Sequence, residues 1–149
     1  MSISKINGET IIAAFGGGYS LRGTLATTSS TNPTAGITYY GGGAAGAAIT
    51  QSSDSRRLYI PKTGTIKSCY GYFNQTASVS GNTGTLNIRL NNLTDTLVGT
   101  AAHNVTNTVY SSTSLSIAVT QGNYIEFKWT CPATTAPTSM TSSFIIYVE

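Results

Sequence analysis

The sequence predicts an all-β fold, an antiparallel β-sandwich or barrel, and three observations support this prediction. Apolar residues take every second position in several short segments, and no window of about eleven residues places them at helical spacing. Turns rich in Gly, Asn and Ser separate these segments at intervals of about ten residues. The length of 149 residues suits one core, because a chain of this size buries about two thirds of its unfolded surface.

The first fifty residues differ in composition from the rest. One plausible strand spans residues 19–26, and a Gly- and Ala-rich tract follows at residues 41–48. This tract has no side chains that could build a core, and its glycines raise the entropy cost of ordering it. We therefore expect residues 1–50 to form an N-terminal attachment arm with a Gly/Ala-rich connector, or loosely tethered strands, and residues 51–149 to form the β-sandwich domain.

From Leu58 onward the alternation of apolar and polar residues is regular. Its clearest case is Leu86, Ile88 and Leu90, which alternate with polar residues and so share one face of a strand. By the same pattern, further strands are expected at residues 58–60, 64–73, 97–98, 105–109, 115–119 and 144–149.

The strand after the Gln-Gly-Asn turn combines large apolar side chains with two charged ones. Ile125, Phe127 and Trp129 alternate there with Glu126 and Lys128. We expect the three apolar side chains to face the core and the two charged ones to face outward.

Four tyrosines have two interpretations each. Tyr70 and Tyr72 share a face with Ile66, which predicts that they point into the core, although a tyrosine at the edge of a sandwich also suits ligand contact. Tyr39 and Tyr40 lie beside the Gly/Ala tract, outside any obvious core face. They either pack on a neighbouring subunit or are simply exposed.

Charged residues are scarce and scattered. They make up 9% of the chain, against about 25% in an ordinary soluble domain, while Ser and Thr together number 43. The net charge is +3, but no run of basic residues is longer than Arg56–Arg57. Because affinity for phosphate backbones grows with clustered cations, no nucleic-acid partner is expected.

The chain also has no sequence signal for a membrane. No stretch approaches the ~20 apolar residues that cross a bilayer. Residues 1–5 lack the basic and then apolar pattern of a secretory signal. We therefore expect a protein that is made in the cytoplasm and has no membrane partner.

Catalysis requires titratable or nucleophilic groups held together, and the sequence predicts no such group. The five acidic residues show no spacing that pairs a general acid with a base, and no Gly-x-Ser-x-Gly segment occurs. The glycine runs lack the Lys-Ser/Thr of phosphate-binding loops. An atypical enzyme would need a cleft that joins Asp54 or Asp95 to His103. We expect a non-enzymatic protein without a cofactor.

Cysteines do not predict a metal site. Cys69 and Cys131 lie 62 residues apart, and the single His103 adds too few ligands at any recognised spacing. The two cysteines either form a disulfide or stay as two buried thiols, and a reducing cytoplasm favours the thiols.

Loops on a rigid sheet are the expected contact surface. The candidate loops span residues 52–57, 75–83 and 131–142. The candidate binding residues on or beside these loops are Tyr39, Tyr40, Arg56, Arg57 and Asn82.

The later part of the chain resembles a known module. The features are Gly64-Thr65-Ile66 at the start of a strand, the hairpin at residues 81–84, the segment 121–127 and the ending at residues 144–149. They are similar to the jelly-roll module of virion-surface proteins of tailed bacteriophages, namely head fibres, capsid decoration proteins and tail-fibre tips. Asn123 stands where that module often has an acid. The resemblance implies a jelly-roll sandwich, a homotrimer, an N-terminal arm that grips the particle, and outward loops.

These observations together predict a non-enzymatic structural protein located on a virion, either a capsid decoration or a head or tail fibre. Such a protein would form a homo-oligomer, since closed oligomers cover exposed sheet edges with copies of themselves. It would bind other virion proteins through the N-terminal arm. The alternative is a receptor- or glycan-binding module for host attachment, in which exposed aromatic rings stack on sugars and Asn side chains bond their hydroxyls.

Overall fold

The computed structural model describes residues 17–27, 33–43, 50–53, 56–76, 82–102, 105–134 and 136–149. Within these ranges the chain forms ten β-strands and no helix. The strands are β1 (Tyr19–Ala26), β2 (Thr38–Gly41), β3 (Leu58–Tyr59), β4 (Gly64–Thr76), β5 (Thr83–Leu90), β6 (Thr94–Ala102), β7 (Asn107–Ser112), β8 (Ile117–Val119), β9 (Tyr124–Thr130) and β10 (Ser139–Val148).

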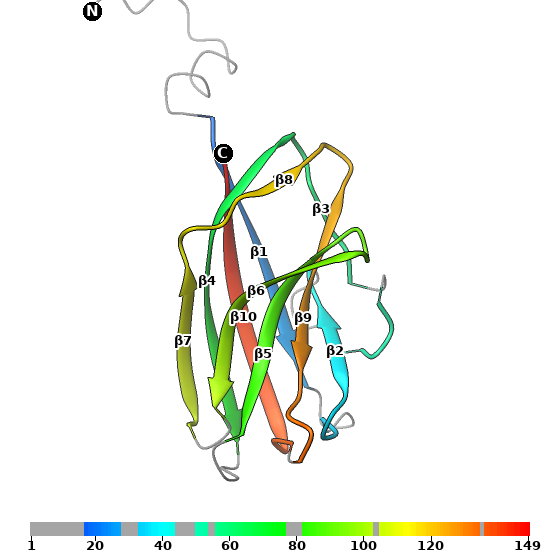
Figure 1. Cartoon of the computed structure of the whole chain (residues 1–149), viewed down its shortest axis with the longest axis vertical. Helices are drawn as coiled ribbons and strands as arrows, with labels where there is room; N and C mark the ends of the chain where they lie inside the picture. The colour runs from blue at the N-terminus through cyan, green and yellow to red at the C-terminus, as the bar shows by residue number, and fades with distance from the viewer. Residues whose placement is uncertain are drawn as a thin grey trace, which may run out of the picture.

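Two antiparallel sheets pack against each other, which confirms the predicted sandwich (Figure 1). Sheet A has the order β1-β10-β4-β7, with β8 also paired to β4. Sheet B has the order β2-β9-β5-β6, with β3 also paired to β9. The pairs nest, because β1 joins β10, β2 joins β9, β4 joins β7 and β5 joins β6. This nesting is a long hairpin wound on itself, the topology of a jelly roll.

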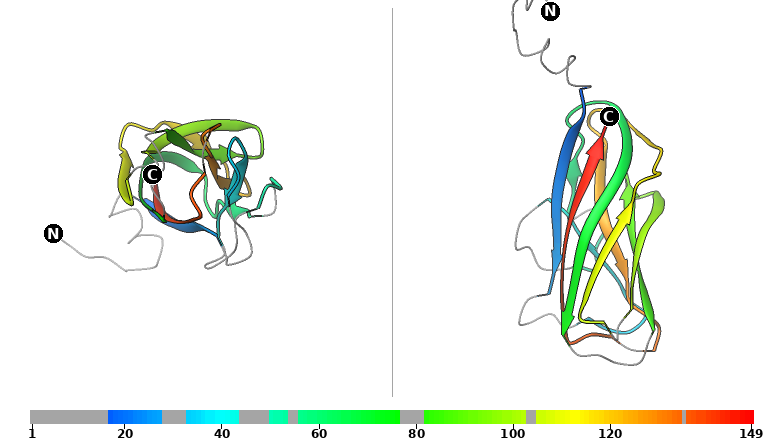
Figure 2. Two further views of the ribbon diagram at one scale, coloured as in Figure 1. Left: turned by 90° about the horizontal axis from the view of Figure 1, so that it is seen from below. Right: turned by 90° about the vertical axis from the view of Figure 1, so that its left-hand side faces the viewer.

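The two sheets face each other (Figure 2), and aromatic side chains join them across the core. Phe127 of sheet B stacks on Phe144 of sheet A, with ring centroids 4.3 Å apart. The ring centroid of Trp129 in sheet B lies 5.6 Å from that of Phe73 in sheet A. The alternation in β9 therefore predicted its inward side chains correctly. Burial of each large apolar side chain stabilises the fold by about 1.5–3 kcal/mol.

A row of small and large residues crosses the inner side of sheet A. Phe144 in β10 pairs with Gly23 on one side and Gly71 on the other, and Gly71 pairs with Tyr110. A Cβ atom at Gly23 would collide with the ring of Phe144, and one at Gly71 would collide with the ring of Tyr110. Both rings thus lie directly against strand backbone, which only glycine permits at these two positions.

The expected boundary at residue 50 is wrong, because two strands of the sandwich precede it. Residues 19–26 pair along their whole length with β10, and residues 38–41 pair with β9. Part of the Gly/Ala tract also belongs to the sheets, since Gly41 ends β2 and Gly42 forms a bridge with Thr24. Residues 1–16 lie outside the described residues, so the attachment arm stays a prediction.

Tyr39 lies in the core, contrary to expectation. Its side chain is 2% exposed, and its ring stacks on Trp129 with centroids 5.7 Å apart. The reason is that residues 38–41 form β2, in which Tyr39 is the register partner of Trp129. Tyr40, the next residue, points to the opposite side of sheet B and is half-buried.

Tyr70 and Tyr72 face outward, so their expected place in the core is also wrong. Where β4 pairs with β10, the register shifts and skips Lys67. Such a bulge reverses the side on which the following residues point. Ile66 is therefore inside, while the two tyrosines beyond the bulge are on the outer face of sheet A.

Candidate functional site

An exposed apolar patch covers part of the outer face of sheet A. Its members are exposed by 49% (Tyr70), 41% (Tyr72), 80% (Val109) and 39% (Ile145). They are neighbours across strands, since Ile145 pairs with Tyr70 and Val109 pairs with Tyr72. No acidic residue occurs in any strand of sheet A. We call these four residues the apolar face.

Hydrogen bonds hold one tyrosine of the apolar face in place. The Tyr72 hydroxyl donates to Oδ1 of Asn107 at 2.6 Å, and Nδ2 of Asn74 donates to the same oxygen at 2.6 Å. These bonds fix the ring of Tyr72 across β4 and β7. Less side-chain entropy is therefore lost when the ring contacts a partner.

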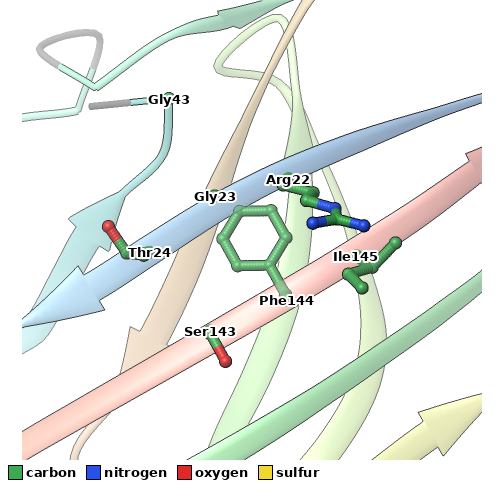
Figure 3. Close-up of a pocket in the computed structure, with 7 residues that line it drawn as sticks. All are labelled: Arg22, Gly23, Thr24, Gly43, Ser143, Phe144 and Ile145. Atoms are coloured by element: carbon green, nitrogen blue, oxygen red, sulfur yellow. The ribbon is translucent and has the colours of Figure 1, made fainter. Parts of the chain in front are cut away.

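Two hollows lie on the outer face of sheet A, one on each side of β10. The first, of about 320 Å³, is bounded by Arg22 and Thr24 of β1, by residues 143–145 of β10, and by Gly43 (Figure 3). The second, of about 260 Å³, is bounded by the same part of β10 and by Tyr70, Tyr72 and Val109. The first therefore has a cation at its rim, whereas the second is uncharged.

The outer face of sheet B carries a network of paired charges. Asp95 of β6 accepts from Nη1 of Arg89 at 3.0 Å and from Nζ of Lys128 at 2.5 Å. The same arginine donates to the carbonyl oxygen of Asn92 at 2.9 Å and lies 5.8 Å from the ring centroid of Tyr40. The network holds two cations and one carboxylate, so it keeps one net positive charge, but each of the three groups already has a partner.

Glu126 points to this outer face as expected, but it is only 1% exposed. Arg56 lies against it, because the amide of Arg56 donates to Oε1 of Glu126 at 3.4 Å. Nearby, two backbone hydrogen bonds join Tyr40 and Thr50. Among the described residues, Oε2 of Glu126 has no hydrogen-bond partner. Alternation therefore predicted the side of the strand correctly, but it does not tell whether that side is covered.

The structure does not bring the five predicted binding residues into one site. Tyr40, Arg56 and Arg57 lie on the side of sheet B, and the guanidinium of Arg57 stacks 4.4 Å above the ring of Tyr124. Asn82 lies before β5 and donates to the Thr134 hydroxyl. The remaining one is Tyr39, in the core.

Val109, Ile145 and Arg22 were not among the predicted binding residues, although the alternation of side chains indicates exposure of the first two. In the run Phe144-Ile145-Ile146, strict alternation requires that the middle residue face away from its neighbours. By the same rule, Val109 points to the face of the strand that Tyr110 does not use. No sequence signal places Arg22 at the rim of a hollow, because its neighbours there come from β10.

Titratable groups of the described residues show no catalytic arrangement. No cluster of three His, Cys, Asp or Glu side chains that could hold a metal ion occurs among them. Cys69 and Cys131 form no disulfide and are buried, and burial raises the pKa of Cys69 to about 12 and that of Cys131 to about 11. Both thiols are poor nucleophiles at neutral pH as a result. Asp54 and His103, which an atypical enzyme would need in a cleft with Asp95, lie outside the described residues.

Comparisons with known proteins do not connect the chain to a family. No family model matches the sequence, and no curated protein matches it. Within the described ranges, no helix is long and apolar enough to span a membrane.

Proposed function

We propose that this chain is a non-enzymatic structural protein of a virion surface, and that it assembles with copies of itself through the apolar face of sheet A. The observation that carries the proposal is the apolar face itself. Cores of subunit interfaces are depleted of charge and enriched in tyrosine, as these four residues are. Val109, with four fifths of its surface exposed, gains most from being covered.

A jelly roll with few charges suits a particle surface for a physical reason. Its outer strands present many Ser and Thr hydroxyls, whose hydration depends little on pH or salt. The resemblance of residues 64–149 to jelly-roll modules of phage virions supports the same assignment and favours a trimer. Under this proposal the protein needs no cofactor.

The pairing of the first and last strands gives the proposed protein two different ends. Tyr19 pairs with Val148, so β1 begins where β10 finishes. Strands β5 and β10 begin at the opposite end (Figure 1). We place the attachment to other virion proteins at the end where β1 begins, through residues 1–16, which leaves the opposite loops outward.

Light scattering tests the assembly directly. We expect the purified chain to have the mass of a trimer at micromolar concentration and the Val109→Lys variant to have the mass of a monomer, because a buried unpaired ammonium is costly. Thr100→Lys is the matched control. It places the same charge on an exposed strand position of sheet B and leaves the trimer intact. A monomeric wild-type chain, or a trimeric Val109→Lys variant, contradicts the proposal.

A further inference from the structure

The hollow beside Arg22 has a built arrangement of side chains at its rim (Figure 3). Arg22 pairs with Ile145 across β1 and β10, and Thr24 pairs with Ser143. These four outward residues surround the backbone of the Gly23–Phe144 pair. The hollow therefore combines one guanidinium, two hydroxyls and one aliphatic side chain above a floor without charge.

Arg22 is available to a ligand. Its guanidinium is exposed and makes no hydrogen bond or ion pair with any described residue. The described acidic residues lie elsewhere: Asp95 and Glu126 are on sheet B, and Glu149 follows the end of β10. An unpaired cation at the rim of a hollow without carboxylates favours an anionic ligand.

The number of cations selects the kind of anion. A single guanidinium matches a planar carboxylate through two parallel hydrogen bonds. Sites that recognise a doubly charged phosphate gather several cations or helix N-termini, and this hollow has one cation on a sheet.

The remaining rim groups fit a sugar. The Thr24 and Ser143 hydroxyls both donate and accept, as the hydroxyls of a pyranose ring require. Ile145 offers an apolar surface for the C–H side of such a ring. The volume of about 320 Å³ is at the lower end of the range for small-molecule sites, which suits one or two sugar units. We propose that the hollow beside Arg22 binds a uronic-acid unit of a surface polysaccharide, with Arg22 on its carboxylate.

This proposal goes beyond self-assembly and uses a different part of sheet A. The apolar face extends from β10 toward β7, whereas the hollow extends from β10 toward β1. Ile145 borders both, so a copy on the apolar face would cover its β7 side and the sugar would contact its β1 side. A structural protein with such a site would also hold its particle on a polyanionic host surface.

The test is a titration of the full-length chain with trigalacturonic acid, followed by amide chemical shifts and calorimetry. We expect saturable binding, with shifts centred on residues 22–24 and 143–145. Galactotriose, the neutral counterpart, and a triglutamate peptide should bind at least about tenfold more weakly.

Variants locate the site. Arg22→Gln should lower the affinity for trigalacturonic acid at least about tenfold, while Arg22→Lys retains part of it. Lys67→Gln, which removes another exposed cation from sheet A, should leave affinity and shifts unchanged. The proposal is overturned by no saturable binding at millimolar trigalacturonic acid, by equal binding of the neutral sugar or the peptide, or by an Arg22→Gln variant of wild-type affinity.

Discussion

The outer faces of the two sheets differ in how their side chains are satisfied. On sheet A, tyrosine, valine and isoleucine side chains face solvent without a cover. On sheet B, Arg89, Asp95 and Lys128 form ion pairs, and the amide of Arg56 contacts the buried Glu126. Sheet B also exposes Leu97 of β6 and Tyr59 of β3, so the contrast concerns grouping: sheet A places four exposed apolar side chains together on neighbouring strands, where a second molecule can bury them.

A charged or apolar side chain on the surface is available for binding only when no other part of the chain already contacts it. The charges of sheet B look functional in the sequence, yet they mainly bind each other. The apolar residues of sheet A look structural in the sequence, yet they are outside the core. The presence of a partner within the chain, rather than the residue type, decides which of these side chains is available for binding.

The largest expected effect is that of Gly71→Val, which fills the space beside β4 that the ring of Tyr110 occupies. The new side chain would collide with the Tyr110 ring and push β7 away from β4. We expect the free energy of unfolding to fall by about 3 kcal/mol or more, as measured by urea denaturation. Ser111→Val, at an exposed position of β7, is the control and should change stability by less than about 0.5 kcal/mol. Equal stability of the Gly71→Val and wild-type proteins would show that Tyr110 does not depend on this glycine.

Glu126→Ala should have an intermediate effect, because it removes the contact that holds the cover on sheet B. The amide of Arg56 loses its acceptor, and a buried space opens beneath the described segment that begins at Arg56. We expect a loss of about 1–3 kcal/mol and faster hydrogen exchange at the Arg56 amide. Glu149→Ala, at an exposed carboxylate, should change neither quantity. Unchanged exchange at Arg56 would mean that Glu126 does not retain this segment.

Asp95→Asn should have the smallest effect, although it breaks both ion pairs on sheet B. The two pairs are partly exposed, so solvent screens them and replaces much of what is lost. We expect thermal or urea denaturation to show a loss of at most about 1 kcal/mol, and less at 1 M salt. A loss above about 2 kcal/mol would indicate that the network acts as a buried unit.

Much of the fold was predictable, because alternation is a local property. Leu86 and Ile88 of β5 and the three apolar residues of β9 face the core as their spacing predicts. The nested order of strands agrees with the jelly roll that the resemblance implied.

The errors arose where a distant segment decides the outcome. The bulge at Lys67 is set by the pairing of β4 with β10, and it moves Tyr70 and Tyr72 to the other side. Tyr39 is buried because β2 joins β9, which lies about ninety residues later in the sequence. The cover on Glu126 comes from a segment about seventy residues earlier. Neither the burial of a strand position nor the members of a hollow can be derived from local spacing alone.

The position of β10 has a consequence for the synthesis of the protein. The last strand of the sandwich lies in the interior of sheet A, between the first strand and β4. Until the ribosome has released β10, β1 has no partner in its sheet, and Phe127 lacks the ring of Phe144 that stacks on it. Folding of sheet A is therefore expected to wait for β10 and to be slow, since the closing contact spans more than a hundred residues. Nascent chains would meanwhile expose strand edges, which favours aggregation.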